Sequence, residues 1–162
     1  MKIGVLSDTH DRLPVLRRAV TLFRRLQVQA VFHAGDFVAP FAAQLLNPEA
    51  LGGIPLHAVF GNNDGERKGL KTILPNIVDG PLTVKLAGKI IVMHHFIDWL
   101  KPEPIAVADL IITGHTHKIA NENRAGKLFL NPGECGGWLT DRCTVAIVDL
   151  PTLKADIVEV HE

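Results

Sequence analysis

Short apolar runs recur along this chain, and five of them are followed directly by side chains that can bind metal ions. The runs have the length and content of buried strands. The five polar segments are Asp8-Thr9-His10, Gly35-Asp36, Gly61-Asn62-Asn63-Asp64, Met93-His94-His95 and Gly114-His115-Thr116-His117. Because ligands gather at the carboxyl ends of strands in open α/β sheets, these segments can converge although they lie far apart in sequence.

The order of predicted elements indicates an α/β fold. Apolar runs at residues 3–6, 30–33 and 56–60 alternate with helical patterns at 14–26 and 39–46, as in a parallel sheet covered by helices. The second half carries three hairpin signals, which pair residues 82–86 with 89–93, 121–123 with 128–131, and 144–150 with 153–160. One further strand is expected at residues 110–113. We expect about nine to eleven strands and three helices, arranged as a two-sheet mixed β sandwich flanked by helices.

Composition limits the size of the fold and its partners. The chain has 162 residues, 47% of them hydrophobic, which fits one domain over residues 1–162. The 17 basic and 17 acidic residues cancel, so no global field favours nucleic acid or an anionic membrane. No apolar run reaches the roughly 18 residues of a membrane span, and the start of the chain lacks a signal-peptide pattern. We therefore expect a cytoplasmic protein.

The five segments together offer at least two carboxylates, an amide and four imidazoles, which is enough to hold two divalent ions. Each segment alone is also compatible with an ordinary turn or helix cap. Asp8 and His10 are two residues apart, as are His115 and His117, so on an extended backbone each pair points one way. Glycines before the ligands permit sharp turns and close approach to an ion. Paired ions are a device for hydrolysing phosphate esters.

With these motifs, the chain resembles the calcineurin-like metallophosphoesterase superfamily, and most closely its small, lid-less bacterial and archaeal phosphodiesterases. The resemblance implies a dinuclear site in which Asp36 bridges the two ions and a metal-bridging hydroxide is the nucleophile. It also implies the remaining ligands, which are Asp8, His10 and His117 for one ion and Asn62, His94 and His115 for the other. Such mixed ligands suit Mn²⁺, Fe²⁺, Ni²⁺, Co²⁺ or Zn²⁺, and the resemblance favours Mn²⁺.

The chain departs from the family pattern at two positions that bear on catalysis. Asn63 replaces a histidine that contacts phosphate in many relatives, and its amide can still donate a hydrogen bond to a phosphate oxygen. His95 replaces a glycine. It could line the pocket and offer a proton, or it could point into the core because it is next to His94 along a strand.

Two further residues are candidates for contact with substrate. Arg67 lies in a basic stretch that could steer a phosphate or form a solvated loop. Trp99 could stack on a base or an aromatic leaving group, or pack in the core.

The favoured function is hydrolysis of a small phosphodiester. Two divalent ions carry four positive charges, and two carboxylates and one hydroxide leave a single positive charge to meet the single negative charge of a diester. The alternatives are a phosphomonoesterase and a non-catalytic scaffold of the same fold, like the retromer subunit. A homodimer is compatible with the sequence, although no pattern demands it.

Overall fold

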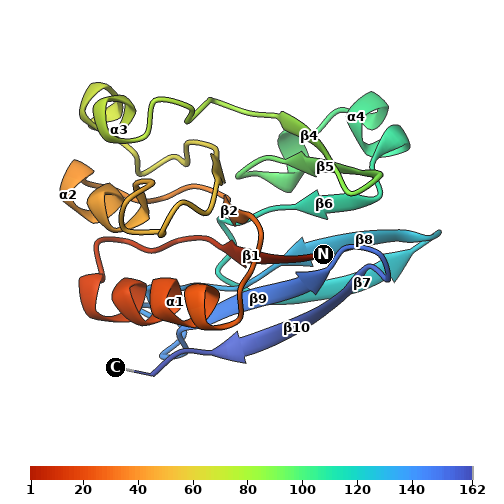
Figure 1. Cartoon of the computed structure of the whole chain (residues 1–162). Helices are drawn as coiled ribbons and strands as arrows, with labels where there is room; N and C mark the ends of the chain where they lie inside the picture. The colour runs from red at the N-terminus through yellow and green to blue at the C-terminus, as the bar shows by residue number, and fades with distance from the viewer. Residues whose placement is uncertain (162) are drawn as a thin grey trace.

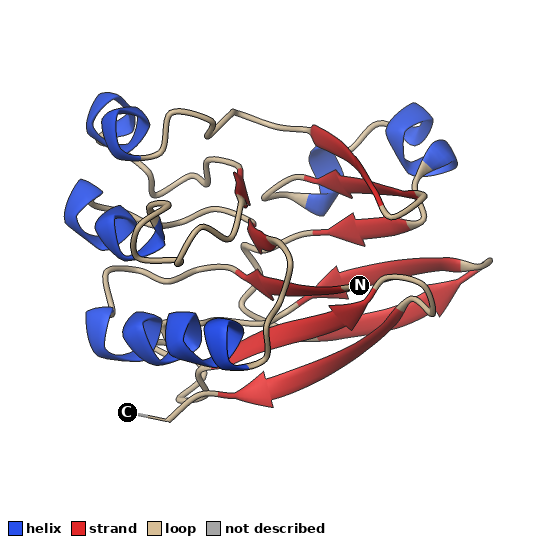
Figure 2. Cartoon of the chain, in the orientation of Figure 1, coloured by secondary structure: helices blue, strands red, loops and turns tan. Residues whose placement is uncertain are grey.

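The computed structural model describes residues 1–161, and ten strands in that range form two five-stranded sheets (Figures 1 and 2). The strands are β1 (Lys2–Leu6), β2 (Val31–His33), β3 (Leu56–Ala58), β4 (Leu82–Leu86), β5 (Lys89–Met93), β6 (Leu110–Ile112), β7 (Ala120–Arg124), β8 (Lys127–Asn131), β9 (Thr144–Asp149) and β10 (Lys154–Glu159). One sheet has the order β10-β9-β1-β2-β3, and the other has the order β4-β5-β6-β8-β7. The predicted two-sheet sandwich is confirmed.

Helices cover the outer faces of both sheets. They are α1 (Leu13–Arg25), α2 (Pro40–Ala43), α3 (Arg67–Ile73) and α4 (Pro102–Val107), with 3₁₀ turns η1 (Gln44–Leu46) and η2 (Ile97–Trp99). Figure 1 shows α1, α2 and α3 on one side of the sandwich and α4 on the other. Among the described residues, no helix is long and apolar enough to cross a membrane.

The periodicity of the first helix explains where it packs. Pro14 lies in its first turn, a position where the missing N–H costs no helical hydrogen bond. Val15, Leu16, Ala19 and Phe23 are fully buried, so one apolar stripe faces the first sheet. Asp11 does not cap the helix; its Oδ1 accepts a hydrogen bond from Ala39 N at 3.0 Å.

Three layers of apolar side chains hold the sheets and helices together. The central layer lies between the sheets and includes Val5, Phe32 and Met93. On the outer face of the second sheet, Val92 packs with Ile111 under α4. The residues of β5 therefore alternate between an inner and an outer face, and this alternation continues into the functional site.

The sequence predicts the helices less well than the strands. The helix expected at residues 39–46 is divided into α2 and η1. The basic stretch around Arg67 is not a solvated loop but the start of α3. That helix has seven residues with a glycine near its middle, too short and too polar for a clear period of 3.6.

Candidate metal centre

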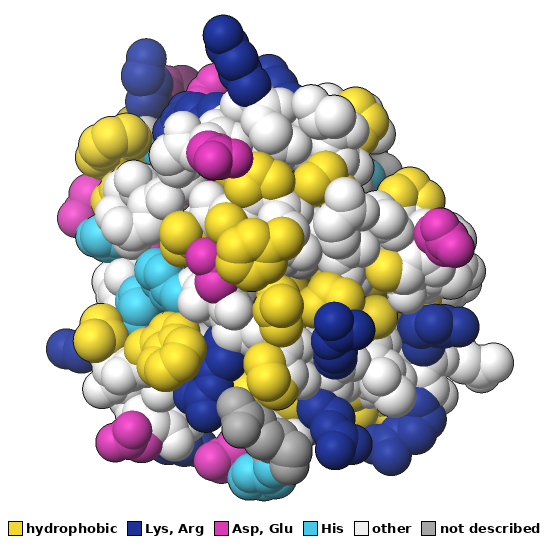
Figure 3. All heavy atoms as spheres, turned by 90° about the vertical axis from the view of Figure 1, so that its left-hand side faces the viewer, with side chains coloured by type: hydrophobic (Ala, Val, Ile, Leu, Met, Phe, Trp, Pro, Cys, Tyr) yellow, Lys and Arg dark blue, Asp and Glu magenta, His cyan; other side chains and the backbone are white. Residues whose placement is uncertain are grey.

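The five polar segments come together at one edge of the sandwich. They follow β1, β2, β3, β5 and β6, and backbone hydrogen bonds join the first two loops: Asp8 N donates to Gly35 O at 3.0 Å and Thr9 N to Asp36 O at 3.0 Å. His115 N donates to the Asp8 carboxylate at 3.2 Å and so ties the two sheets together. Figure 3 views the side of the molecule at which these strands end, where histidine side chains reach the surface beside hydrophobic ones.

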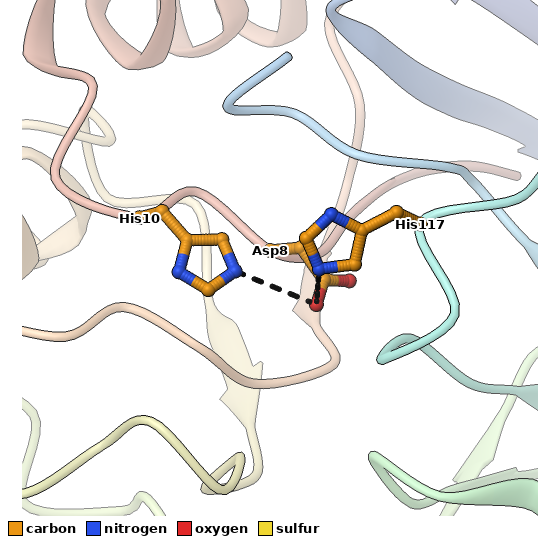
Figure 4. Close-up of side chains that lie close together, drawn as sticks. All are labelled: Asp8, His10 and His117. Carbon is orange, nitrogen blue, oxygen red and sulfur yellow. Dashed lines mark ion pairs between the residues drawn. The ribbon is translucent and has the colours of Figure 1, made fainter. Parts of the chain in front are cut away.

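Asp8, His10 and His117 form the first group of potential ligands (Figure 4). His117 Nε2 lies 3.4 Å from Asp8 Oδ1, and His10 Nε2 lies 3.9 Å from the same oxygen. His10 Nε2 is buried, yet it has no hydrogen-bond partner within residues 1–161. A buried donor or acceptor without a partner is costly. Two imidazole nitrogens aimed at one carboxylate oxygen fit a divalent ion held among them.

The second group of potential ligands consists of Asp36, His95 and Asp8. His95 Nε2 lies 3.4 Å from Asp36 Oδ2 and 3.0 Å from Asn62 Oδ1. His115 Nδ1 lies 3.0 Å from the same Asn62 oxygen. Asp36 Oδ2 is also 3.6 Å from His10 Nε2 of the first group. One carboxylate oxygen therefore lies between histidines of both groups.

His95, and not His94, faces Asp36, so the structure favours His95 over His94 at this one position of the predicted ligand set. Side chains alternate along a strand, and Met93 on β5 points into the layer between the sheets. His95 is two residues after Met93, so its side chain points to the same inner side and lies in the site. His94 has the parity of Val92, which faces outward, and its Nδ1 accepts a hydrogen bond from Phe96 N at 2.9 Å. His95 does not point into the hydrophobic core.

The backbone at the site adopts a conformation that the sequence analysis did not anticipate. Asp8, His10, Asp36, His115 and His117 all have positive φ, between 41° and 66°. The expectation that Asp8 with His10, and His115 with His117, lie on extended backbone is therefore wrong. Positive φ is unfavourable for residues with a side chain, and such strain is typical of functional sites.

Glycines allow the loops to pack this closely. A Cβ atom at Gly61 would collide with the carboxylate of Asp36, and one at Gly114 would lie 2.8 Å from Asp8 Oδ2. A side chain at either position would therefore displace a candidate ligand.

Opposing effects set the charges of the central groups. Burial raises the pKa of Asp8 and outweighs the lowering effect of Ser7, His95 and His117. Burial also acts to raise the pKa of Asp36, but hydrogen bonds and charge from His95, with hydrogen bonds from Asn63, hold that pKa below its usual value. Burial acts to lower the pKa of His95, and its contact with Asp36 raises it overall. The lowered pKa keeps Asp36 ionised at neutral pH, and a buried carboxylate that stays ionised is suited to a cation.

Two buried carboxylates support the ligands. Asp64 accepts backbone hydrogen bonds from both the Asp36 and the Asn62 loops, including Asp36 N at 3.0 Å and Gly61 N at 2.7 Å. Glu134 Oε1 lies 3.3 Å from His117 Nδ1, the position of a group that fixes a metal-binding imidazole. Asp64 stands inside one of the five segments, but no spacing rule points to Glu134, which follows the last segment by 17 positions along the sequence.

The remaining predicted residues lie close to the centre. Asn63 N and Nδ2 donate to the two oxygens of Asp36, each at 2.8 Å, so the amide contacts the central carboxylate. Arg67 donates from Nε to Asp64 O at 3.3 Å and forms an ion pair with Asp79. The site thus brings together six of the seven predicted ligands, adds His95, and places Asn63 and Arg67 nearby.

Comparison with known proteins decides the family. The model for the calcineurin-like phosphoesterase superfamily domain matches residues 1–152. The chain belongs to this superfamily. A protein of Methanocaldococcus jannaschii named phosphodiesterase MJ0936 is 38% identical over 160 residues, covering 92% of this chain and 93% of that protein.

Solved structures agree with this assignment. A structure described as a novel archaeal phosphodiesterase superposes with a TM-score of 0.85 at 33% identity, covering 99% of this chain and 100% of the other. YfcE, a phosphoesterase from E. coli, gives a TM-score of 0.74 at 22% identity, with 99% and 100% covered, and supports the fold alone. The predicted resemblance is confirmed, and hydrolysis of phosphate esters is the activity that the family supports.

Proposed function

We propose that this chain is a phosphodiesterase that depends on two divalent metal ions. The observation that carries the proposal is the position of Asp36, whose Oδ2 lies 3.6 Å from His10 Nε2 and 3.4 Å from His95 Nε2. A carboxylate that reaches histidines on both sides is suited to bridge two ions.

The donors divide into two sets around this carboxylate. Asp8, His10 and His117 would complete one site with Asp36, and Asn62, His95 and His115 would complete the other. Oxygen and imidazole nitrogen donors without thiolate suit Mn²⁺, Fe²⁺, Co²⁺, Ni²⁺ or Zn²⁺, and the family resemblance favours Mn²⁺. When bound, such ions supply a hydroxide nucleophile at neutral pH and neutralise charge on the phosphoryl oxygens.

The chain's own residues would position the substrate. Asn63 uses its amide nitrogen to contact Asp36 Oδ2, and the second amide hydrogen can be donated to a phosphate oxygen. His95, as a ligand, would not serve as the proton donor suggested by the sequence. With His95 bound to a metal and Asn63 at the position of the histidine found in many relatives, we expect the leaving group to depart with little help from general acid catalysis.

Assays with two chromogenic esters test this proposal. The enzyme loaded with Mn²⁺ should hydrolyse bis-p-nitrophenyl phosphate faster than p-nitrophenyl phosphate, because the diester charge matches the single positive charge of the centre. Chelation with EDTA should abolish the activity. Faster hydrolysis of the monoester would favour a phosphomonoesterase, and stoichiometric metal without hydrolysis of either ester would favour a non-catalytic scaffold.

The variant Asp36→Asn tests the bridging role. It should lose activity and bind both ions more weakly, as measured by metal analysis after gel filtration. Asp156→Asn removes an exposed carboxylate on β10 and serves as the control. Unchanged hydrolysis in Asp36→Asn would refute the assignment.

A further inference from the structure

A small groove opens beside the candidate metal centre. Asn62 lines both, and Arg67, His94, Phe96 and Trp99 line the rest of the groove together with neighbouring residues. Its volume is about 200 Å³, below the roughly 300–1,000 Å³ of pockets that enclose a whole drug-sized ligand. The groove therefore fits one ring system of a ligand whose remainder lies elsewhere.

Aromatic rings form a continuous surface from the metal centre into this groove. The Phe96 ring lies 4.3 Å from that of His115, a proposed ligand, measured between centroids. Phe96 in turn stacks on Trp99 with centroids 4.4 Å apart and planes inclined by 23°. Burial of an aromatic side chain normally stabilises a fold. Trp99 nevertheless leaves 67% of its surface exposed. The ring is thus available to a ligand.

Polar groups surround the aromatic surface and are held in fixed positions. The Arg67 guanidinium lies 4.6 Å from the centre of the Phe60 ring and is paired with Asp79. His94 receives its hydrogen bond from Phe96 N, so its ring stays at the groove wall. A flat apolar face with a few polar groups at its rim suits a heteroaromatic ring that has hydrogen-bonding edges.

We propose that this groove binds the nucleoside portion of a nucleotide phosphodiester, with the base stacked on Trp99 while the phosphate lies at the metal centre. An acyl chain would not use the polar rim. The position of the phosphate rests on the function proposed above, whereas stacking on Trp99 does not.

Comparing the affinities of the Mn²⁺-loaded protein for two monophosphates, one with a base and one without, measures the contribution of the base separately from that of the phosphate. In isothermal titration calorimetry, AMP should bind about 5–150-fold more tightly than ribose 5-phosphate, the range expected for one stacked base. Trp99→Ala should reduce this ratio to about 3 or less and leave ribose 5-phosphate binding unchanged, while Trp99→Phe should keep most of the ratio. Phe41→Ala is the control, because Phe41 is another largely exposed aromatic residue, 56% accessible, that does not line the groove.

Equal binding of AMP and ribose 5-phosphate by the wild-type protein would overturn the proposal, as would a ratio that survives Trp99→Ala. The same conclusion follows if Phe41→Ala lowers the ratio as much as Trp99→Ala. If AMP is preferred through Trp99 but no phosphodiester is hydrolysed, the groove assignment stands and the proposed enzymatic function fails.

Discussion

The substitution Asp64→Asn should weaken the whole fold as well as the metal centre. Asp64 is buried, and its Oδ1 accepts hydrogen bonds from Phe37 N at 2.7 Å and Val38 N at 2.8 Å. Its Oδ2 accepts from Asp36 N at 3.0 Å and Gly61 N at 2.7 Å. An asparagine amide keeps one acceptor oxygen and places an NH₂ group, a donor, where the other oxygen was. Two of the four hydrogen bonds are therefore lost, and two backbone donors face another donor.

The size of the effect follows from the charge of the acceptor. A hydrogen bond to a charged group contributes about 1.5–3 kcal/mol, so losing two should lower the free energy of unfolding by about 3–6 kcal/mol. That is a large share of the about 5–15 kcal/mol that holds a typical domain. In urea, with a slope of about 2 kcal/mol/M, the midpoint should fall by about 1.5–3 M.

Urea titration of the metal-free protein at pH 7, followed by circular dichroism, measures this change. Asp156→Asn, which alters an exposed carboxylate, should change the stability by no more than about 0.5 kcal/mol. If Asp64→Asn behaves like this control, the hydrogen bonds of Asp64 do not hold the two loops in place, and the reasoning is refuted.

Three further predictions concern groups around the site. Glu134→Gln should weaken metal binding about 10–100-fold, because Glu134 Oε1 lies 3.3 Å from His117 Nδ1 and would fix that ring when it binds a metal. Titration with Mn²⁺ measures the affinity, and an unchanged affinity would contradict this role. Burial lowers the pKa of His33 to about 3, so between pH 6.5 and 3 the unfolded state binds the extra proton and stability falls as the pH falls. From pH 7 to 5 the free energy of unfolding should fall by about 2 kcal/mol. Urea titrations of the metal-free protein should show a smaller fall in His33→Gln than in the wild type, and an equal fall in both proteins would exclude His33 as its source. The enzyme should hydrolyse nitrophenyl esters much faster than alkyl esters, since no strong general acid is assigned; comparable rates would show that one exists.

Apolar runs and their polar ends were enough to predict the sandwich. A buried strand needs apolar side chains along its length, and Val5 or Met93 could not lie elsewhere at low cost. The convergence of Asp8, Asp36 and His117 follows from the rule that places ligands at the carboxyl ends of strands.

The features that could not be predicted from the sequence depend on the direction in which individual side chains point and on contacts between segments that are distant in sequence. The choice between His94 and His95 needs the parity of β5, which was available only once Met93 was known to face the inner layer. The positive φ values of Asp8 and His10 arise from the packing of the loops after β1 and β2 against each other. Glu134 reaches His117 through tertiary structure, so no local pattern could reveal it.

X-ray diffraction from crystals soaked in Mn²⁺, with anomalous maps at the manganese edge, tests the central claim most directly. Two peaks roughly 3.5–4 Å apart are expected, with a carboxylate oxygen of Asp36 bound to both and the His95 ring bound to one. A single peak, or two peaks of which neither touches Asp36, would contradict the proposed dinuclear centre.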